Sequence, residues 1–103
     1  MLEEEIQKER SLETIIFRVQ KMEGYLDEIV KTMENAFSSD SVKKDKRLQG
    51  MLSELTDYYE NGQWLKDYEC DERGELPADL KRGVLAEDTL YNFFCEMKEK
   101  GML

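Results

Sequence analysis

The side chains that could carry chemistry gather in residues 58–88, which hold the only Trp and the only Pro of the chain. Within this stretch, Lys81 and Arg82 lie shortly before Glu87 and Asp88. An arginine guanidinium offers a planar pair of donors that matches a carboxylate. These side chains could therefore form a pocket for a carboxylate or another small anion. The alternative is that they form structural ion pairs that hold the stretch against its neighbours.

The candidate binding site combines these charges with aromatic and acidic side chains from the same stretch. Its residues are Tyr59, Trp64, Asp67, Lys81, Arg82, Glu87 and Asp88. Trp64 could serve as a platform for a ligand. It could equally anchor a short helix, because a short helix needs a large apolar side chain to hold it in place.

The sequence carries no signature of catalysis or of metal binding. It has no His, the commonest proton-transfer group near neutral pH, so Cys70 and Cys95 lack a His that could activate them. The spacing of these cysteines does not match a zinc site. The acidic run from Asp67 to Glu75 fits no register of a calcium-binding loop. We expect a protein that is not an enzyme and has no metal or cofactor, with an activity of carboxylates paired by folding as the alternative.

Composition indicates a small helical domain. The chain has 103 residues, of which 38% are charged and 40% hydrophobic, with a single Pro. The net charge of −9 repels phosphate backbones, so we expect no nucleic-acid partner, and we interpret the basic run from Lys43 to Arg47 as a solvated face. No apolar run is long enough to span a membrane, and the start lacks a signal-peptide pattern. We expect a cytoplasmic protein with buried or half-buried, reduced thiols and no membrane partner.

A long amphipathic helix is predicted over residues 1–37. Apolar residues recur at spacings of three and four and form a heptad seam: Leu12, Ile15, Val19, Met22, Leu26, Ile29, Met33 and Ala36. Ile16, Val30 and Phe37 widen this seam, whereas Leu2 and Ile6 lie off it. Two packing arrangements follow. The seam packs within the chain as part of an antiparallel helical hairpin, or it also forms a homodimer through the Leu12 to Phe37 helix.

A second helix is predicted over residues 42–60, after a loop and N-cap at Ser38–Ser41. We expect it to run antiparallel to the first helix. Its predicted buried face contains Leu48, Leu52, Leu55 and Tyr59, with Met51 and Tyr58 beside it. Asn61 and Gly62 should end it, because Gly readily takes the left-handed conformation that closes a helix.

Short helices are predicted to follow in a compact segment, residues 61–88, and a last helix over residues 87–100. A helix over residues 63–73 should carry Trp64, Leu65 and Tyr68 on one apolar face and end at Gly74. A one-turn helix should begin at Pro77 and close at Gly83, with Val84 and Leu85 docked inward. The predicted buried face of the last helix contains Leu90, Tyr91, Phe94 and Met97. The fold class expected for residues 1–103 is therefore a single all-α domain, a small helical bundle.

Three motifs resemble those of a known family. The first joins Arg18 to Met22 and Glu23, the second is the run YYENGQWLKD, and the third is the run LPADLKRGVLAED. Together they resemble DUF4298, a family of small uncharacterised bacterial proteins, and the resemblance covers the chain from Arg18 to near Lys98. The resemblance implies a bacterial source and a small helical fold, but no activity, substrate or cofactor. Ala86 stands where the family has Ser, which removes a hydroxyl suited to capping the last helix.

Two hypotheses of function follow from the sequence. In the first, the protein is a non-catalytic interaction module that acts by protein–protein contact, as a homodimer or on a protein partner. In the second, it is a small-ligand or anion-binding module that uses Trp64, Asp67, Lys81 and Arg82. Whether Arg82 and Asp67 converge on one accessible hollow distinguishes the two hypotheses.

Overall fold

The computed structural model describes residues 2–35 and 43–102, and these residues form helices joined by turns. The helices are α1 (Leu2–Asn35), α3 (Lys46–Glu60), α4 (Gln63–Glu72), the 3-10 helix η1 (Gly83–Leu85) and α5 (Thr89–Glu99). No strand occurs within these two ranges. The all-α prediction is confirmed. No helix in this part of the chain is both long and apolar enough to cross a membrane.

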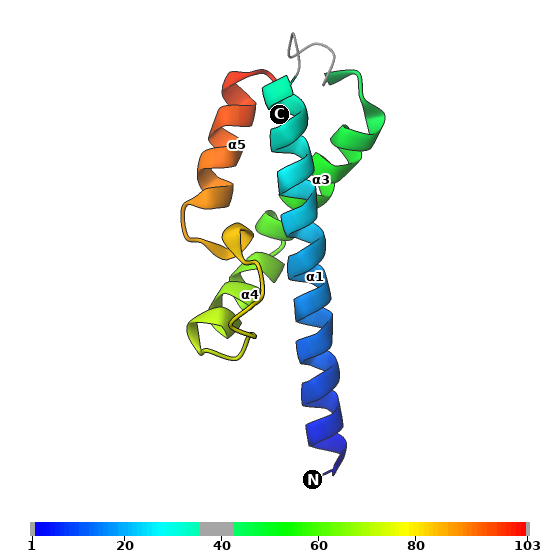
Figure 1. The fold of residues 1–103 in the computed structure, drawn as a ribbon, viewed down its shortest axis with the longest axis vertical. Helices are drawn as coiled ribbons and strands as arrows, with labels where there is room; N and C mark the ends of the chain where they lie inside the picture. Colours follow the sequence, from blue (N-terminus) through cyan, green and yellow to red (C-terminus); the bar gives the residue numbers. More distant parts are fainter. Residues whose placement is uncertain (1, 36–42, 103) are drawn as a thin grey trace.

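Helix α1 runs along the long axis of the molecule, which measures 55 × 25 × 23 Å (Figure 1). Its heptad seam faces the core as predicted: Val19, Met22, Leu26 and Ile29 are buried, and Leu12, Ile15 and Met33 are half-buried. Of the expected helix over residues 1–37, Ala36 and Phe37 lie outside the described residues. Figure 1 shows the N-terminal part of α1 extending past α4, with no other described element beside it.

Helix α3 packs antiparallel to α1, as the ion pairs between the two helices show. Lys21 pairs with Glu54 at 3.4 Å, and Glu28 pairs with Arg47 at 2.9 Å, so positions rise along α1 as they fall along α3. The helix begins at Lys46, because the Asp45 side chain accepts hydrogen bonds from the backbone N–H of Arg47 and Leu48 and so caps it. Helix α3 thus begins four residues after the predicted start, and both residue 42 and the predicted cap at Ser38–Ser41 lie outside the described residues.

The buried face of α3 differs from the prediction at its last turn. Leu48, Leu52 and Leu55 are buried as predicted, but the fourth buried residue is Tyr58, and Tyr59 is half-buried. Tyr58 and Tyr59, three and four residues after Leu55, both continue the spacing of the buried leucines, and Tyr58 is the buried one because its hydroxyl donates a hydrogen bond to the buried Asp67 of α4. Gly62 has φ 84°, so it adopts the left-handed conformation expected of it.

Helix α4 buries an aspartate and a cysteine where a face of larger apolar residues was predicted. Its buried residues are Asp67 and Cys70, whereas Leu65 is 50% exposed. Trp64 and Tyr68 are half-buried and stack on each other, with ring centroids 5.1 Å apart. A hydrophobic pattern could not predict this orientation, because the residue that determines it is a charged one. Gly74, with φ 72°, follows the helix end as predicted.

The predicted one-turn helix that begins at Pro77 is a turn. The N–H of Leu80 donates to the carbonyl of Pro77 at 3.2 Å, but no helix forms. The Arg82 side chain donates to the carbonyls of Pro77 and Leu80, so these carbonyls are satisfied without continuing a helix. Gly83 then begins η1 and does not close a helix. Val84 and Leu85 are buried, as predicted, and η1 contacts α1, α4 and α5.

Helix α5 buries Leu90, Phe93 and Met97. The prediction named Tyr91 and Phe94, but Tyr91 is 59% exposed and Phe94 is half-buried against Tyr59. The buried set keeps a spacing of three and four, which Tyr91 does not share.

The start of α5 and the cysteines also differ from the expectations. The N-cap of α5 is Asp88, which makes no side-chain capping bond, so position 86 lies before the cap and is not the capping position. Cys70 is buried, whereas Cys95 is exposed and does not match the expected buried or half-buried state.

Candidate functional site

Asp67 is fully buried and is bound by side chains from two other helices. Arg18 of α1 donates Nε–H to Oδ2 at 2.9 Å and Nη2–H to Oδ1 at 2.6 Å. Tyr58 of α3 donates its hydroxyl to Oδ2 at 2.7 Å. The two-pronged, charge-assisted pair offsets the desolvation of the carboxylate, because both of its oxygens have donors. Asp67 thus joins α1, α3 and α4 at one point.

The electrostatics of this cluster favour a structural role. Burial first, and then the hydrogen bond to Asp67, raise the pKa of the Tyr58 phenol far above its ordinary value. The hydrogen bond to Asp67 raises the pKa of Arg18, and this effect outweighs the partial burial of the guanidinium. Near neutral pH, Tyr58 is therefore neutral and Arg18 charged. A general acid or base needs a pKa close to the working pH, and these two groups do not have one.

The backbone of Val84 is held from both sides. Glu23 of α1, which is 7% exposed, accepts the N–H of Val84 with Oε2 at 2.6 Å. Trp64 of α4 donates its indole N–H to the carbonyl of Val84 at 2.9 Å. A Cβ at Gly83 would lie 2.9 Å from Oε1 of Glu23, so the glycine allows this carboxylate to approach. The pair of hydrogen bonds fixes η1 between α1 and α4.

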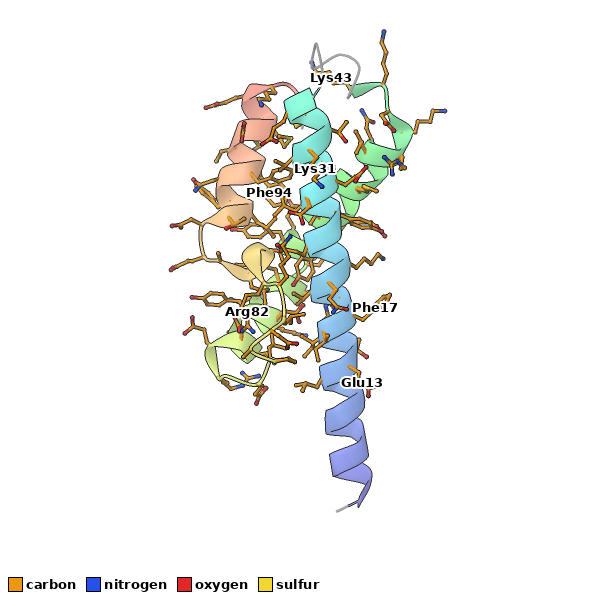
Figure 2. All side chains as sticks on the ribbon, viewed as in Figure 1. Glu13, Phe17, Lys31, Lys43, Arg82 and Phe94 are labelled. Atoms are coloured by element: carbon orange, nitrogen blue, oxygen red, sulfur yellow. The ribbon has the colours of Figure 1, made fainter. Side chains whose placement is uncertain are left out.

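The charged residues of the candidate binding site do not converge. Arg82 pairs with Asp71 of α4 and donates to two backbone carbonyls, and Figure 2 shows it on the α4 side of the molecule. Lys81 pairs with Asp27 of α1 at 2.8 Å on the surface. Glu87 and Asp88 are exposed at the start of α5. Asp67 is paired with Arg18, so it does not meet Arg82.

The aromatic residues of the candidate site form a half-buried cluster. The Tyr59 ring lies 5.3 Å from the Trp64 ring and 5.4 Å from the Phe94 ring, measured between centroids. Aromatic pairs at such distances in tilted geometry stabilise a fold beyond the area they bury. The cluster connects α3, α4 and α5, which agrees with the interpretation of Trp64 as an anchor.

Surface hollows among the described residues lie beside these clusters. One, of about 420 Å³, lies between α1 and the turn after Leu76, and its walls are Ile16, Gln20, Glu23, Gly24, Asp27, Pro77, Asp79, Leu80 and Lys81. A second, of about 410 Å³, lies over Arg18 and Tyr58 and has Glu54 and Asp57 in its walls. These carboxylates oppose an anionic ligand. Another, of about 210 Å³, has Tyr59, Tyr91, Phe94 and Cys95 among its walls. Among the described residues, no cluster of His, Cys, Asp or Glu could hold a metal ion.

Arg18, Glu23 and Tyr58 were not placed in the candidate site by the sequence argument, although each belongs to a motif that carries the resemblance. Their spacing held a signal. Glu23 lies four residues after Val19 on the seam, and Arg18 lies four residues before Met22. A charged residue on the core face of a helix needs a buried partner.

Comparison with known proteins gives one family. The family described as "Domain of unknown function (DUF4298)" matches residues 19–101. The chain belongs to the DUF4298 family. Within this DUF4298 protein, the match begins one residue after Arg18 and covers Glu23 and Trp64, whose side chains bind the backbone of Val84. No curated protein and no solved structure matches the chain.

Proposed function

We propose that this DUF4298 protein is a non-catalytic interaction module of the bacterial cytoplasm that acts by protein–protein contact through the outer face of α1. The observation that carries the proposal is the 68% exposure of Phe17, a large apolar side chain in the middle of a described helix. Figure 2 shows Phe17 and Glu13 on the side of α1 that is turned away from α4 and α5.

The internal pairing of the motif residues supports this proposal over the ligand-binding alternative. Arg82 directs its Nε, Nη1 and Nη2 to Leu80, Asp71 and Pro77 respectively. Each of its three nitrogens therefore donates a hydrogen bond within the chain, so an anion that binds Arg82 in a two-pronged manner would compete with these partners. Asp67 likewise has donors on both of its oxygens.

The shape of the molecule also supports the proposal. Helix α1 continues toward the N-terminus beyond α4, and no other described element lies beside this part of it (Figure 1). An amphipathic helix that projects in this way can pack on a partner helix at low cost, because its backbone is already ordered.

The native size of the protein in lysates of its source cells tests the proposal. We expect the wild type to elute in a larger species than the Phe17→Glu variant, because a charge in the contact opposes association. Leu65→Glu is the matched control, since Leu65 is also exposed and apolar, at 50%, but lies on α4. Elution of the wild type and Phe17→Glu at the size of the single chain, both in lysate and as concentrated purified chains, would refute the proposal.

A further inference from the structure

We infer that the partner of the outer face of α1 is a second copy of this chain, packed antiparallel about Phe17. This inference rests on the proposed function and specifies its partner. It starts from a row of side chains at spacings of four: Glu13, Phe17 and Lys21. We refer to these three residues as the outer row.

The outer row is accessible along its whole length. Phe17 is 68% exposed, Glu13 is exposed, and the Lys21 side chain is 39% exposed. Residues four apart lie on one ridge of a helix, so the row spans about 12 Å. The acid and the base lie at equal distances on either side of the phenyl ring.

This arrangement is complementary to itself. In an antiparallel pair centred on Phe17, the Glu13 of one copy lies level with the Lys21 of the other, and the same holds in reverse. The two phenyl rings meet at the centre, where each covers the apolar surface that the other exposes. In a parallel pair, by contrast, Glu13 would face Glu13 and Lys21 would face Lys21, and like charges repel. The charge order therefore selects the antiparallel direction.

Known packing rules allow this geometry. Ridges formed by residues four apart interdigitate when two helices cross at about −50°, the commonest class of helix packing in globular proteins. A two-fold contact of this kind uses the same patch on both copies and closes at the dimer. Crossed helices that touch at one row bury little area, so the dimer is expected to be weak and dependent on concentration.

The existing contacts of Lys21 within the chain do not prevent the contact with a second copy. Its Nζ lies over the Tyr25 ring, 5.6 Å from the ring centroid, and contacts of this kind at a surface are weak. Its ion pair with Glu54 has an N–O distance of 3.4 Å and lies on the surface, with the glutamate side chain 48% exposed. Surface pairs of this kind contribute little to stability, because water and salt screen both charges. Residues 19–101 match the family, so Glu13 and Phe17 lie outside the match and the inference concerns this chain, not the whole family.

Sedimentation equilibrium of the purified full chain tests the inference through charge reversal. Glu13→Lys and Lys21→Glu should each weaken the dimer about 5- to 10-fold, because each substitution replaces two attractive pairs by two repulsive ones. The double variant Glu13→Lys/Lys21→Glu should restore the dissociation constant to within about 3-fold of the wild type, since the reversed pairs attract again. Phe17→Glu should weaken the dimer at least about 10-fold, and Leu65→Glu should leave it unchanged.

Two results would overturn the inference. One is a wild-type chain that stays monomeric at its highest soluble concentration. The other is a dimer that the double charge reversal fails to restore, since an antiparallel contact about Phe17 requires this restoration. Circular dichroism of each variant verifies that it is folded. A monomeric pure chain that still elutes in a larger, Phe17-dependent species from lysate overturns only the second-copy inference, whereas single-chain size in both experiments overturns the proposed function as well.

Discussion

Replacing Asp67 by Ala should be one of the most destabilising single changes in this protein. The carboxylate is fully buried and accepts hydrogen bonds from Arg18 at 2.6 and 2.9 Å and from Tyr58 at 2.7 Å. Its removal leaves a guanidinium and a phenol without their acceptor. Removing one partner of a buried pair costs about 3–5 kcal/mol. Because the Arg18 side chain is 23% exposed and can recruit water, we expect a loss of about 2–4 kcal/mol.

Urea and thermal unfolding, followed by far-UV circular dichroism, measure this loss. For a domain of this size each kcal/mol lowers Tm by about 4–8 °C, so Asp67→Ala should lower Tm by about 10–25 °C. Asp27→Ala is the matched control, because it removes the same side chain from an exposed ion pair with Lys81. Its effect should stay within about 1 kcal/mol.

A double-mutant cycle with Arg18→Ala separates the pair from its surroundings. If the stabilisation comes from the Arg18–Asp67 pair, the double variant should lose less free energy of unfolding than the sum of the two single losses, by at least about 1 kcal/mol. The reasoning fails if Asp67→Ala is as stable as Asp27→Ala, or if the two single losses simply add.

Three further predictions concern the contact between Gly83 and Glu23, the pH dependence of stability and the reactivity of the two thiols. Gly83→Ala should destabilise the fold by about 1–3 kcal/mol in urea unfolding, because the new methyl group would lie 2.9 Å from a buried carboxylate oxygen of Glu23. Gly24→Ala is the control. No atom lies within 4 Å of its new methyl group, so this variant should be neutral or more stable by up to about 1 kcal/mol. The folded state raises the pKa of Tyr58, so stability from this group is complete below about pH 10 and is lost as the pH rises further, and Tyr58→Phe should reduce this loss in unfolding experiments at increasing pH. Cys95 is exposed and should react with a thiol reagent in the native protein. Cys70 is buried, and desolvation raises its pKa, so it should react only when the protein unfolds. Rapid reaction of both thiols in the native protein would contradict the structure.

The periodicity of apolar residues correctly predicted the buried faces of most of α1 and α3. The seam from Val19 to Ile29 and the leucines of α3 face the core, because helix packing follows the spacing of large apolar side chains. The glycines at 62 and 74 end their helices, since only a residue without Cβ adopts the left-handed conformation at little cost. Local chemistry of this kind is encoded in the neighbouring residues.

The polar contacts could not be predicted in the same way. Arg18 and Asp67 are 49 positions apart, and Glu23 and Val84 are 61 positions apart. Such pairs depend on how the helices cross, so sequence spacing can indicate that a charged residue faces the core but not which residue is its partner. Helix α4 shows the consequence: its orientation follows the buried Asp67 and leaves Leu65 exposed, although its apolar residues predicted another face.

Three residues of the candidate site make contacts that stabilise the fold. Trp64 and Asp67 bind groups of neighbouring elements in the interior, and Arg82 binds the carbonyls of the turn before η1. The accessible feature, Phe17 with its flanking charges, drew no notice in the sequence because a single apolar residue off the seam is common on helix surfaces. The charges at equal spacing around it can be read from the sequence, but its exposure became apparent only when the neighbours of α1 were known.

Photocrosslinking from position 17 in living cells tests the central claim, that the protein makes its external contact through the outer face of α1. A photoreactive phenylalanine analogue replaces Phe17 in one variant and Leu65 in the control. We predict a protein adduct at position 17 with twice the mass of the chain, and none at position 65. No adduct from position 17, or equal adducts from both positions, would contradict the account.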